Sequence, residues 1–393
     1  MNNSFRGFDL TERKRKIRRA MDLVPPQTPE DVPVIVHTPC YFGFGEAPRS
    51  PAYWEDPEEM LRFQQDGYEE HLRRVNDDIV PYFMPWFGTG VLASAFGCEI
   101  AMPSGRGGDP AVVSHAVRDV KDIARLKPPD PYKDGQMPVV LKFMEYAARN
   151  GELPVGYTDL NSPLCTAAQL CGYDKLFYWM YDEPEAVHEL MGTITEAFIA
   201  WVRLQRTITG EAPGESNGLQ GVWSPRGGVW LSDDDLVSVS AELYGEFVLP
   251  HYSRIFTEFG GGHLHFCGSG VHQIGNFSLM EGVTAINNSP LGNKEAFQAL
   301  VRAVRGRLCI EIQDAAPLEP EPYYRRLFDG LDDLTGIMIT SFAEHSLATD
   351  RDGRTIEVTR DPADNANSVV AAVRKIAAEM LPRQALKMKP EIC

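Results

Sequence analysis

The strongest constraint on the fold of this chain is a pattern that recurs along the sequence. A short run of β-branched and other apolar residues is followed by a polar turn and then by a segment with helical spacing. The pattern predicts strands at Pro33–Thr38, Asp78–Phe83, Pro154–Asp159, Gly218–Trp223, Gly262–Cys267, Val283–Asn287, Arg307–Gln313 and Thr335–Ser341. Strands that alternate with helices indicate a parallel sheet, because each parallel pairing needs a crossover. Eight such units close a barrel, so we predict an α/β fold of the (β/α)8, or TIM-barrel, type.

Two long excursions, residues 40–75 and 88–136, follow the first two predicted strands. Insertions after barrel strands lie over the mouth, so we expect lids or pocket walls there. Because no low-complexity linker divides the 393 residues, we expect one domain with an N-terminal helical extension over residues 1–30. The basic run of this extension predicts the solvated face of a helix, with a phosphate or subunit contact as the alternative. It consists of Lys14, Arg15, Lys16, Arg18 and Arg19.

Charge and cysteine usage exclude several classes of partner. Asp and Glu number 55 against 38 Lys and Arg, and the net charge of −17 repels nucleic acid and anionic membrane surfaces. No stretch approaches the ~20 consecutive apolar residues of a membrane span, and the N-terminus does not resemble a secretory signal. Seven cysteines lie scattered without paired spacing, which favours a reducing compartment over a disulfide framework. We therefore expect a cytoplasmic protein.

The fifth predicted strand, Gly262–Cys267, carries the most informative side chains. Strand alternation places His263, His265 and Cys267 on one face, and the apolar side chains between them on the other. The polar face then points into the barrel, with His265 and Cys267 nearest the carboxyl end, where barrel enzymes work. An imidazole and a thiolate together are ligands that Zn²⁺ prefers. The alternative is a hydrogen-bonded core histidine beside a cysteine that fills space.

A catalytic zinc normally takes three protein ligands and keeps one open position. For the third ligand we prefer His345, which follows the eighth predicted strand, with its neighbour Glu344 second. Cys309, on the seventh predicted strand, is a further alternative that lies deeper in the barrel. Ordinary polar roles in a loop compete with the ligand role for both His345 and Glu344.

Polar residues at other strand ends complete the predicted site. Asp159 is suited to binding a substrate amine or to general acid–base work, and helix or loop capping is its alternative. The predicted catalytic set is Asp159, His37, His263 and Tyr82, and the predicted cofactor contacts are Trp223 and Asn287.

Several segments also have a familiar order and spacing. They include Phe96-Gly97-Cys98-Glu99, Ser162-Pro163-Leu164, the run from Met180 to His188, and His265-Phe266-Cys267-Gly268. Together they resemble the uroporphyrinogen decarboxylase superfamily over most of the chain. The resemblance implies that true decarboxylases hold the substrate carboxylates with an arginine-rich loop after the first strand. Here that loop has no arginine before Arg49, so porphyrinogen decarboxylation is not expected.

The other branch of the superfamily is similar to methylcobamide:coenzyme M methyltransferases and related corrinoid-linked enzymes. There, the resemblance implies, a His-x-Cys pair and a later cysteine bind zinc, which activates a thiol. His265 and Cys267 match the pair, but Ser341 to His345 hold no cysteine where the later ligand would fall.

The resemblance therefore implies a homodimeric methyltransferase that takes a small methyl donor or acceptor. It would move the methyl group to or from a corrinoid (cobalamin) cofactor on a partner protein, with zinc and a thiol acceptor in the zinc-dependent form. One alternative is a decarboxylase or other lyase that acts on a small carboxylated substrate. Another is a non-catalytic barrel that binds a small ligand or a corrinoid partner.

Overall fold

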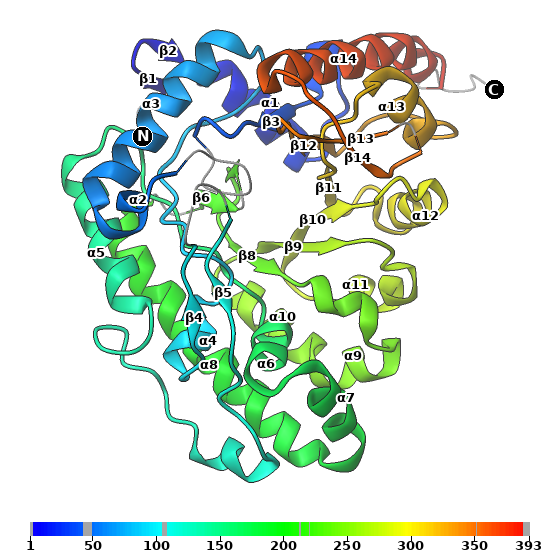
Figure 1. The fold of residues 1–393 in the computed structure, drawn as a ribbon. Coiled ribbons are helices and arrows are strands. Elements are labelled where there is room, and N and C mark those ends of the chain that lie inside the picture. Colours follow the sequence, from blue (N-terminus) through cyan, green and yellow to red (C-terminus); the bar gives the residue numbers. More distant parts are fainter. Residues whose placement is uncertain are drawn as a thin grey trace.

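A six-stranded parallel sheet forms the centre of the molecule, in the order β3-β12-β11-β10-β9-β8 (Figure 1). This computed structural model describes residues 3–41, 49–103, 108–211, 214–219, 221–350 and 352–387. The six strands are β3 (Val34–His37), β8 (Val229–Ser232), β9 (Gly262–Cys267), β10 (Val283–Ser289), β11 (Cys309–Ile312) and β12 (Ile337–Phe342). Their residues are almost all buried, as in parallel sheets that are covered on both faces. The predicted parallel α/β architecture is confirmed.

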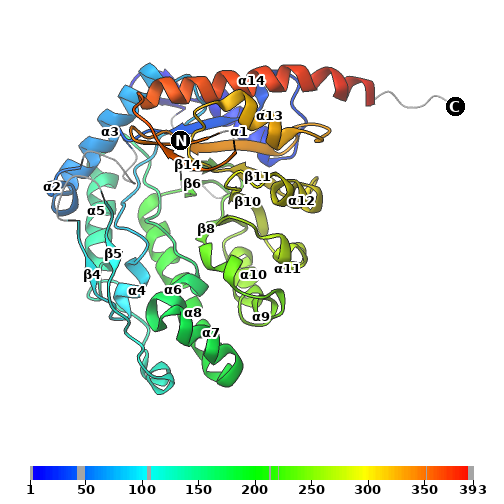
Figure 2. The same cartoon turned by 45° about the vertical axis from the view of Figure 1, so that its right-hand side comes forward.

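Helices surround the sheet on its outer side, and α14 lies across β3 (Figures 1 and 2). The α-helices are α1 (Thr11–Met21), α2 (Ala52–Glu55), α3 (Pro57–Arg74), α4 (Val91–Ala95), α5 (Met137–Asn150), α6 (Pro163–Cys171), α7 (Tyr173–Asp182), α8 (Pro184–Thr209), α9 (Ala241–Phe247), α10 (Leu249–Glu258), α11 (Ile274–Leu279), α12 (Lys294–Val304), α13 (Pro320–Phe328) and α14 (Pro362–Lys387). The 3-10 helices are η1 (Pro29–Asp31), η2 (Val120–Arg125), η3 (Asp234–Ser238) and η4 (Val271–Gln273).

The longer helices begin and end where the sequence marks them. Helix α8 starts with Pro184 at its first position and stops at Gly210, whose φ of 60° is left-handed. The side chain of Asn293 caps helix α12 by accepting from the Ala296 N–H. Such caps satisfy backbone groups that the helix itself leaves without partners.

The arc between β3 and β8 is built differently. Phe83 pairs with Val155, and Asn161 pairs with Ser232, each through a single parallel bridge. Prolines at positions 81, 85 and 154 have no N–H to donate to a continuous ladder. The strands predicted at Asp78–Phe83 and Pro154–Asp159 are therefore extended segments joined by single bridges. Closure of an eight-stranded barrel stays a prediction.

The strand predicted at Gly218–Trp223 is not part of the central sheet. It belongs to an antiparallel hairpin of β6 (Ser216–Leu219) and β7 (Val222–Ser224), and the sheet continues with β8 instead. At the hairpin turn, Gly221 has a φ of +94°, and a Cβ there would lie 2.2 Å from Nε2 of His37. The Gly221 N–H donates to the Tyr82 hydroxyl at 2.6 Å. The hairpin tip thus packs against both of these residues.

The N-terminal extension is a small hairpin, β1 (Ser4–Phe5) and β2 (Phe8–Asp9), followed by α1. The predicted solvated face of α1 holds for Arg15 and Arg18, whose side chains are 42% and 51% exposed. It is wrong for Lys16, which is 11% exposed and pairs with Asp78 at 2.7 Å. Helix α1 therefore covers the end of the sheet where the strands begin.

The two predicted insertions contain regular elements, although residues 42–48 and 104–107 lie outside the described residues. The first holds α2 and α3, and α3 packs against α5 as a crossover helix does. The second holds α4, η2 and the antiparallel pair β4 (Ile100–Ala101) and β5 (Ala111–Val112). A further antiparallel pair, β13 (Leu347–Thr349) and β14 (Thr355–Glu357), follows β12. The single-domain organisation and the role of both insertions as lids stay predictions.

Candidate metal and active site at the carboxyl end of β9

The side chains of β9 alternate as predicted. His265 contacts Asn287 of β10, and His263 contacts Glu311 of β11, so both imidazoles lie on the inner face of the sheet. Phe266 instead stacks on Phe277 of α11, with ring centroids 5.5 Å apart. The polar residues of this strand therefore face the interior, and its phenyl ring faces the helices.

Three metal-ligating side chains meet at the carboxyl end of β9. Nε2 of His265 lies 3.6 Å from the Cys267 sulfur and 3.5 Å from Oδ1 of Asp234. The Cys267 N–H donates to the same Asp234 oxygen at 2.8 Å. One donor atom from each of the three lies within 4.8 Å of the other two. The Asp234 side chain is 55% exposed and His265 only 5%, so the cluster opens to solvent on the side of Asp234.

Asn287 fixes the orientation of the His265 ring. The Asn287 amide nitrogen donates to Oε2 of Glu311 at 3.0 Å and to the Thr340 hydroxyl at 3.2 Å. The Thr340 hydroxyl itself donates to the Ile312 carbonyl, so it can only accept from Asn287. The amide oxygen must then face His265, and it accepts from Nδ1 at 2.7 Å. Nδ1 therefore carries a hydrogen, and Nε2 is the ring atom that faces the cluster.

The electrostatics of the cluster favour a positive charge at this position. Burial lowers the pKa of His265, but its contacts with Asp234 and Cys267 outweigh burial and raise that pKa to about 10. Burial raises the pKa of Asp234, but the hydrogen bond and charge of His265, together with the hydrogen bonds from Cys267, outweigh burial, so that pKa is lowered overall. A metal ion that replaces the proton on Nε2 would meet the same favourable field.

Asp159 and Trp230 flank this cluster. Asp159 is 5% exposed, and in the described part of the chain neither carboxyl oxygen has a hydrogen-bond partner. Burial raises the pKa of Asp159 to about 7, against the opposing effect of His265. Trp230 stacks on the His265 ring, with centroids 5.4 Å apart, and its indole N–H also lacks a partner among the described residues.

The remaining predicted site residues lie deeper or elsewhere. His263 is 2.8 Å from Oε1 of Glu311 inside the sheet. His37 contacts the Tyr41 hydroxyl through Nδ1 at 2.8 Å. Burial raises the pKa of Tyr82, and the nearby Asp159 carboxylate raises it further. Trp223 was expected at the mouth, but it lies under Lys14 of α1, 5.1 Å from the ammonium to the ring centroid. It therefore sits at the opposite end of the sheet from the donor cluster.

None of the three candidates for the third ligand joins the cluster. Across the described residues, His345, Glu344 and Cys309 offer no donor atom within 4.8 Å of both the His265 and the Cys267 donors. Cys309 begins β11, in register with Ala285 and fully buried. Asp234 supplies the third donor instead. The signal for it was the run of three aspartates, 233–235, that follows β8 directly.

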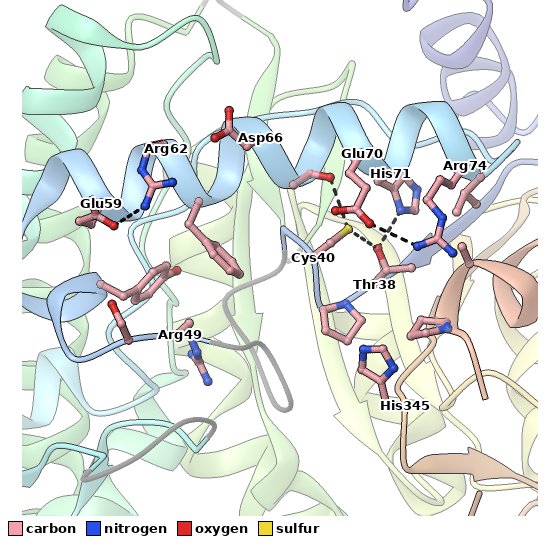
Figure 3. Close-up of a pocket in the computed structure, with 18 residues that line it drawn as sticks. Thr38, Cys40, Arg49, Glu59, Arg62, Asp66, Glu70, His71, Arg74 and His345 are labelled. Carbon is pink, nitrogen blue, oxygen red and sulfur yellow. Dashed lines mark hydrogen bonds and ion pairs between the residues drawn. The ribbon is translucent and has the colours of Figure 1, made fainter. Parts of the chain in front are cut away.

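His345 lines a different cavity of about 530 Å³, between α3 and the loops that follow β3 and β12. Figure 3 shows His345 below α3, on the same side as Thr38 and Cys40 and away from Arg49. The Thr38 hydroxyl contacts Nδ1 of His71 at 2.9 Å, and Nε2 of His71 lies 3.2 Å from Asp77. These contacts connect the end of β3 to α3.

The comparisons with known proteins agree with this architecture. A sequence profile of the uroporphyrinogen decarboxylase (URO-D) family matches residues 15–213. A methylated-thiol–coenzyme M methyltransferase of Methanosarcina mazei is 26% identical over 190 residues, which cover 47% of this chain and 46% of that protein. A uroporphyrinogen decarboxylase of Xanthomonas oryzae pv. oryzae is 29% identical over 180 residues, 42% of this chain and 43% of that enzyme.

These sequence matches span less than half the length of either relative. The solved structure of a methyltransferase from Methanosarcina mazei superposes with a TM-score of 0.62 at 16% identity, over 93% of this chain and 98% of that one. At that identity the superposition speaks for the fold alone. The profile match covers half of the chain, and the chain therefore belongs to the uroporphyrinogen decarboxylase (URO-D) family.

Proposed function

We propose that this protein is a methyltransferase that moves a methyl group to or from a corrinoid (cobalamin) cofactor held by a partner protein. In this proposal a small thiol, held at the donor cluster through zinc, accepts or gives the methyl group. The observation that carries it is the gathering of Asp234, His265 and Cys267 donors at the carboxyl end of β9. The name of the Methanosarcina relative, a methylated-thiol–coenzyme M methyltransferase, supports the same class of reaction.

The residues present fit zinc. Nitrogen, sulfur and oxygen donors are the ones that Zn²⁺ takes in catalytic sites, and three protein ligands leave one position for a substrate. His265, Cys267 and Asp234 would hold the ion, and zinc bound there would lower the pKa of a coordinated thiol so that the thiolate forms near neutral pH.

The chain itself would orient and shield the substrate. Asn287 holds the His265 ring in one orientation through the 2.7 Å hydrogen bond to Nδ1. Trp230 packs against that ring and excludes water from its face. The exposed side of Asp234 leaves a path by which a small methyl donor or acceptor, and the partner's cofactor, could reach the thiol. We further propose a cytoplasmic homodimer, in accord with the scattered cysteines and with the superfamily that the sequence resembles.

The alternative is a decarboxylase or lyase acting on a small carboxylated substrate. Asp159 favours it, because a buried carboxyl with a pKa of about 7 is suited to donating or accepting a proton near neutral pH. Arg49 opposes it. This first arginine after β3 is 2% exposed and already pairs with Asp109 at 2.9 Å, so it is not set to receive a substrate carboxylate. Release of carbon dioxide without any corrinoid would favour the alternative.

Metal content and methyl transfer test the proposal together. Protein purified without added zinc is expected to contain close to one zinc per chain, by elemental analysis. His265→Ala, Cys267→Ser and Asp234→Asn should each lower that content and slow methyl transfer from methylcobalamin to a thiol. Two matched controls, Cys40→Ser and His345→Ala, change the same residue types outside the cluster and should keep the zinc. Undiminished zinc and transfer rate in both Cys267→Ser and Asp234→Asn would remove the cluster from the mechanism.

A further inference from the structure

Asp159 is an anomaly that the proposed chemistry leaves unexplained. The residue is only 5% exposed, and neither carboxyl oxygen makes a well-formed hydrogen bond among the described residues, although the N–H of the neighbouring Leu160 lies close. Buried carboxyl groups are normally paired, because leaving one without a partner costs free energy. Its electrostatic partners, His265 and Asp234, belong to the donor cluster. The carboxyl group therefore lies close to the place where a substrate would bind.

The surroundings of Asp159 are strongly acidic. Asp233, Asp234 and Asp235 follow β8 beside it, and Asp233 is held by neutral donors, the Ser162 hydroxyl at 3.2 Å and the Tyr244 hydroxyl at 3.1 Å. Within the described ranges, no Lys or Arg lies within salt-bridge distance of any of the four aspartates. Away from His265 and from the metal ion that the cluster would hold, a substrate anion would be repelled here, and a cation would be attracted.

Asp159 is also distinct from the metal ligands. It is not part of the group whose donor atoms lie within 4.8 Å of one another. The Trp230 ring stacks on His265, and its buried indole N–H has no partner among the described residues. A molecule bound at the cluster would meet a buried carboxyl group without a partner, and an ammonium group is suited to pair with it.

We propose that the substrate bound beside the donor cluster carries an ammonium group, and that Asp159 binds it. The inference rests on the proposed methyltransferase function and narrows its substrate class. A thiol that carries a sulfonate, such as the coenzyme M named for one relative, would place a negative charge among four carboxylates. The ammonium belongs either to the thiol or to a methylated amine that donates the methyl group.

Three thiols of one shape test the inference directly. 2-Aminoethanethiol, 2-mercaptoethanol and 2-mercaptoethanesulfonate differ only in the group at the end of a two-carbon chain. Their dissociation constants for the zinc-loaded full-length protein can be measured by isothermal titration calorimetry. We expect the ammonium thiol to bind at least roughly tenfold more tightly than the hydroxyl thiol, as charge-assisted hydrogen bonds allow. The sulfonate thiol should bind most weakly.

Two substitutions test whether the carboxyl group of Asp159 causes the preference for the ammonium thiol. Asp159→Asn should abolish the gap between the ammonium and hydroxyl thiols while leaving the zinc content and the hydroxyl thiol affinity unchanged. Asp235→Asn removes a charge from the same acidic run and should change the gap much less. Loss of zinc from Asp159→Asn would identify Asp159 as a metal ligand and overturn the inference.

The thiol series in the unaltered protein decides the question even if the variants fold poorly. Sulfonate binding as tight as ammonium binding, together with no binding of methylammonium beside 2-mercaptoethanol, would overturn the inference and leave the methyltransferase proposal intact. Absence of binding by all three thiols would instead overturn the proposed function. Methylammonium, added together with 2-mercaptoethanol, distinguishes the sources. Simultaneous binding places the ammonium on the methyl donor, and failure of methylammonium to bind, with the thiol preference retained, places it on the acceptor.

Discussion

The two ends of the sheet treat their carboxylates in opposite ways. Where the strands begin, each buried aspartate has a cation from α1. The pairs are Lys16 with Asp78, Arg13 with Asp77 and Arg15 with Asp31. Where the strands end, Asp159 and Asp233–Asp235 have no Lys or Arg within salt-bridge distance in the described part of the chain. The ion pairs at the first end stabilise the fold. The carboxylates without cations at the second end create a negative potential that a bound ligand can use.

The largest expected effect of breaking this contrast lies at the paired end. Lys16→Met keeps the apolar stem of the side chain but leaves Asp78, 2% exposed, without its cation. Removal of one partner of a buried ion pair costs about 3–5 kcal/mol, so the free energy of unfolding should fall by that amount in urea titrations. Arg15→Met on the same helix is the control, because Arg15 is 42% exposed and its pairs should be worth less than about 1 kcal/mol. Equal stability of the two variants would show that burial does not strengthen these pairs.

At the unpaired end, the expected effect is a dependence of stability on pH. The folded pKa of Asp159, about 7, lies above the ordinary value of 3.8. Between these values the folded protein keeps a proton that the unfolded chain releases, so stability should fall as pH rises from about 4 to about 7. Asp159→Asn should abolish this fall in the free energy of unfolding, which is on the order of a few kcal/mol.

This pH dependence can be measured by urea unfolding of metal-free protein from pH 4 to pH 8. The variant and the parent should be equally stable near pH 4, and the variant should become the more stable one toward pH 8. Two parallel curves would mean that Asp159 has a partner in solution, and that the two ends of the sheet do not differ in the way the structure indicates.

A smaller effect should follow from changes behind the cluster. The Glu311→Gln side chain can donate as well as accept, so the Asn287 amide could flip. A flipped amide would no longer accept from Nδ1 of His265, and Nε2 would no longer be fixed as the ring atom that faces the cluster. Loss of such an outer contact typically lowers metal affinity 10–100-fold, which competition titration with a zinc chelator would measure. His263→Gln breaks the other contact of Glu311 and should cost much less. An equal loss in both variants would point to general damage of the core rather than to ring orientation.

The sequence predicted strands best where the whole strand is buried. β9 has the predicted bounds, and β3, β10, β11 and β12 fall on their predicted runs, because apolar residues that are buried on both faces leave a continuous signal. Gly218–Trp223 was misplaced because a hairpin strand and a sheet strand share the same local alternation. The strand that the sheet uses, β8, has only four residues, and the sequence pattern predicts no strand there.

The site was only partly predictable for a related reason. His265 and Cys267 share a strand, so their spacing alone brings them together. Asp234 reaches them from the 3-10 helix that follows the neighbouring strand β8, and no periodicity encodes a distance between residues on two different strands. His345 follows a strand and Trp223 belongs to one, as the other candidate residues do. The sequence does not tell that His345 lines a different cavity or that Trp223 lies at the opposite end of the sheet.

The three donors of the cluster come from two different kinds of element. Nitrogen and sulfur come from one rigid strand, whereas oxygen comes from Asp234, at the first position of a short 3-10 helix with an exposed side chain. If the cluster binds metal, substitutions in this surface turn would change metal preference and exchange rate while the central sheet stays unchanged. Relatives with the same His-x-Cys strand need not share their remaining ligand, and a search for them should score that turn separately from the strand.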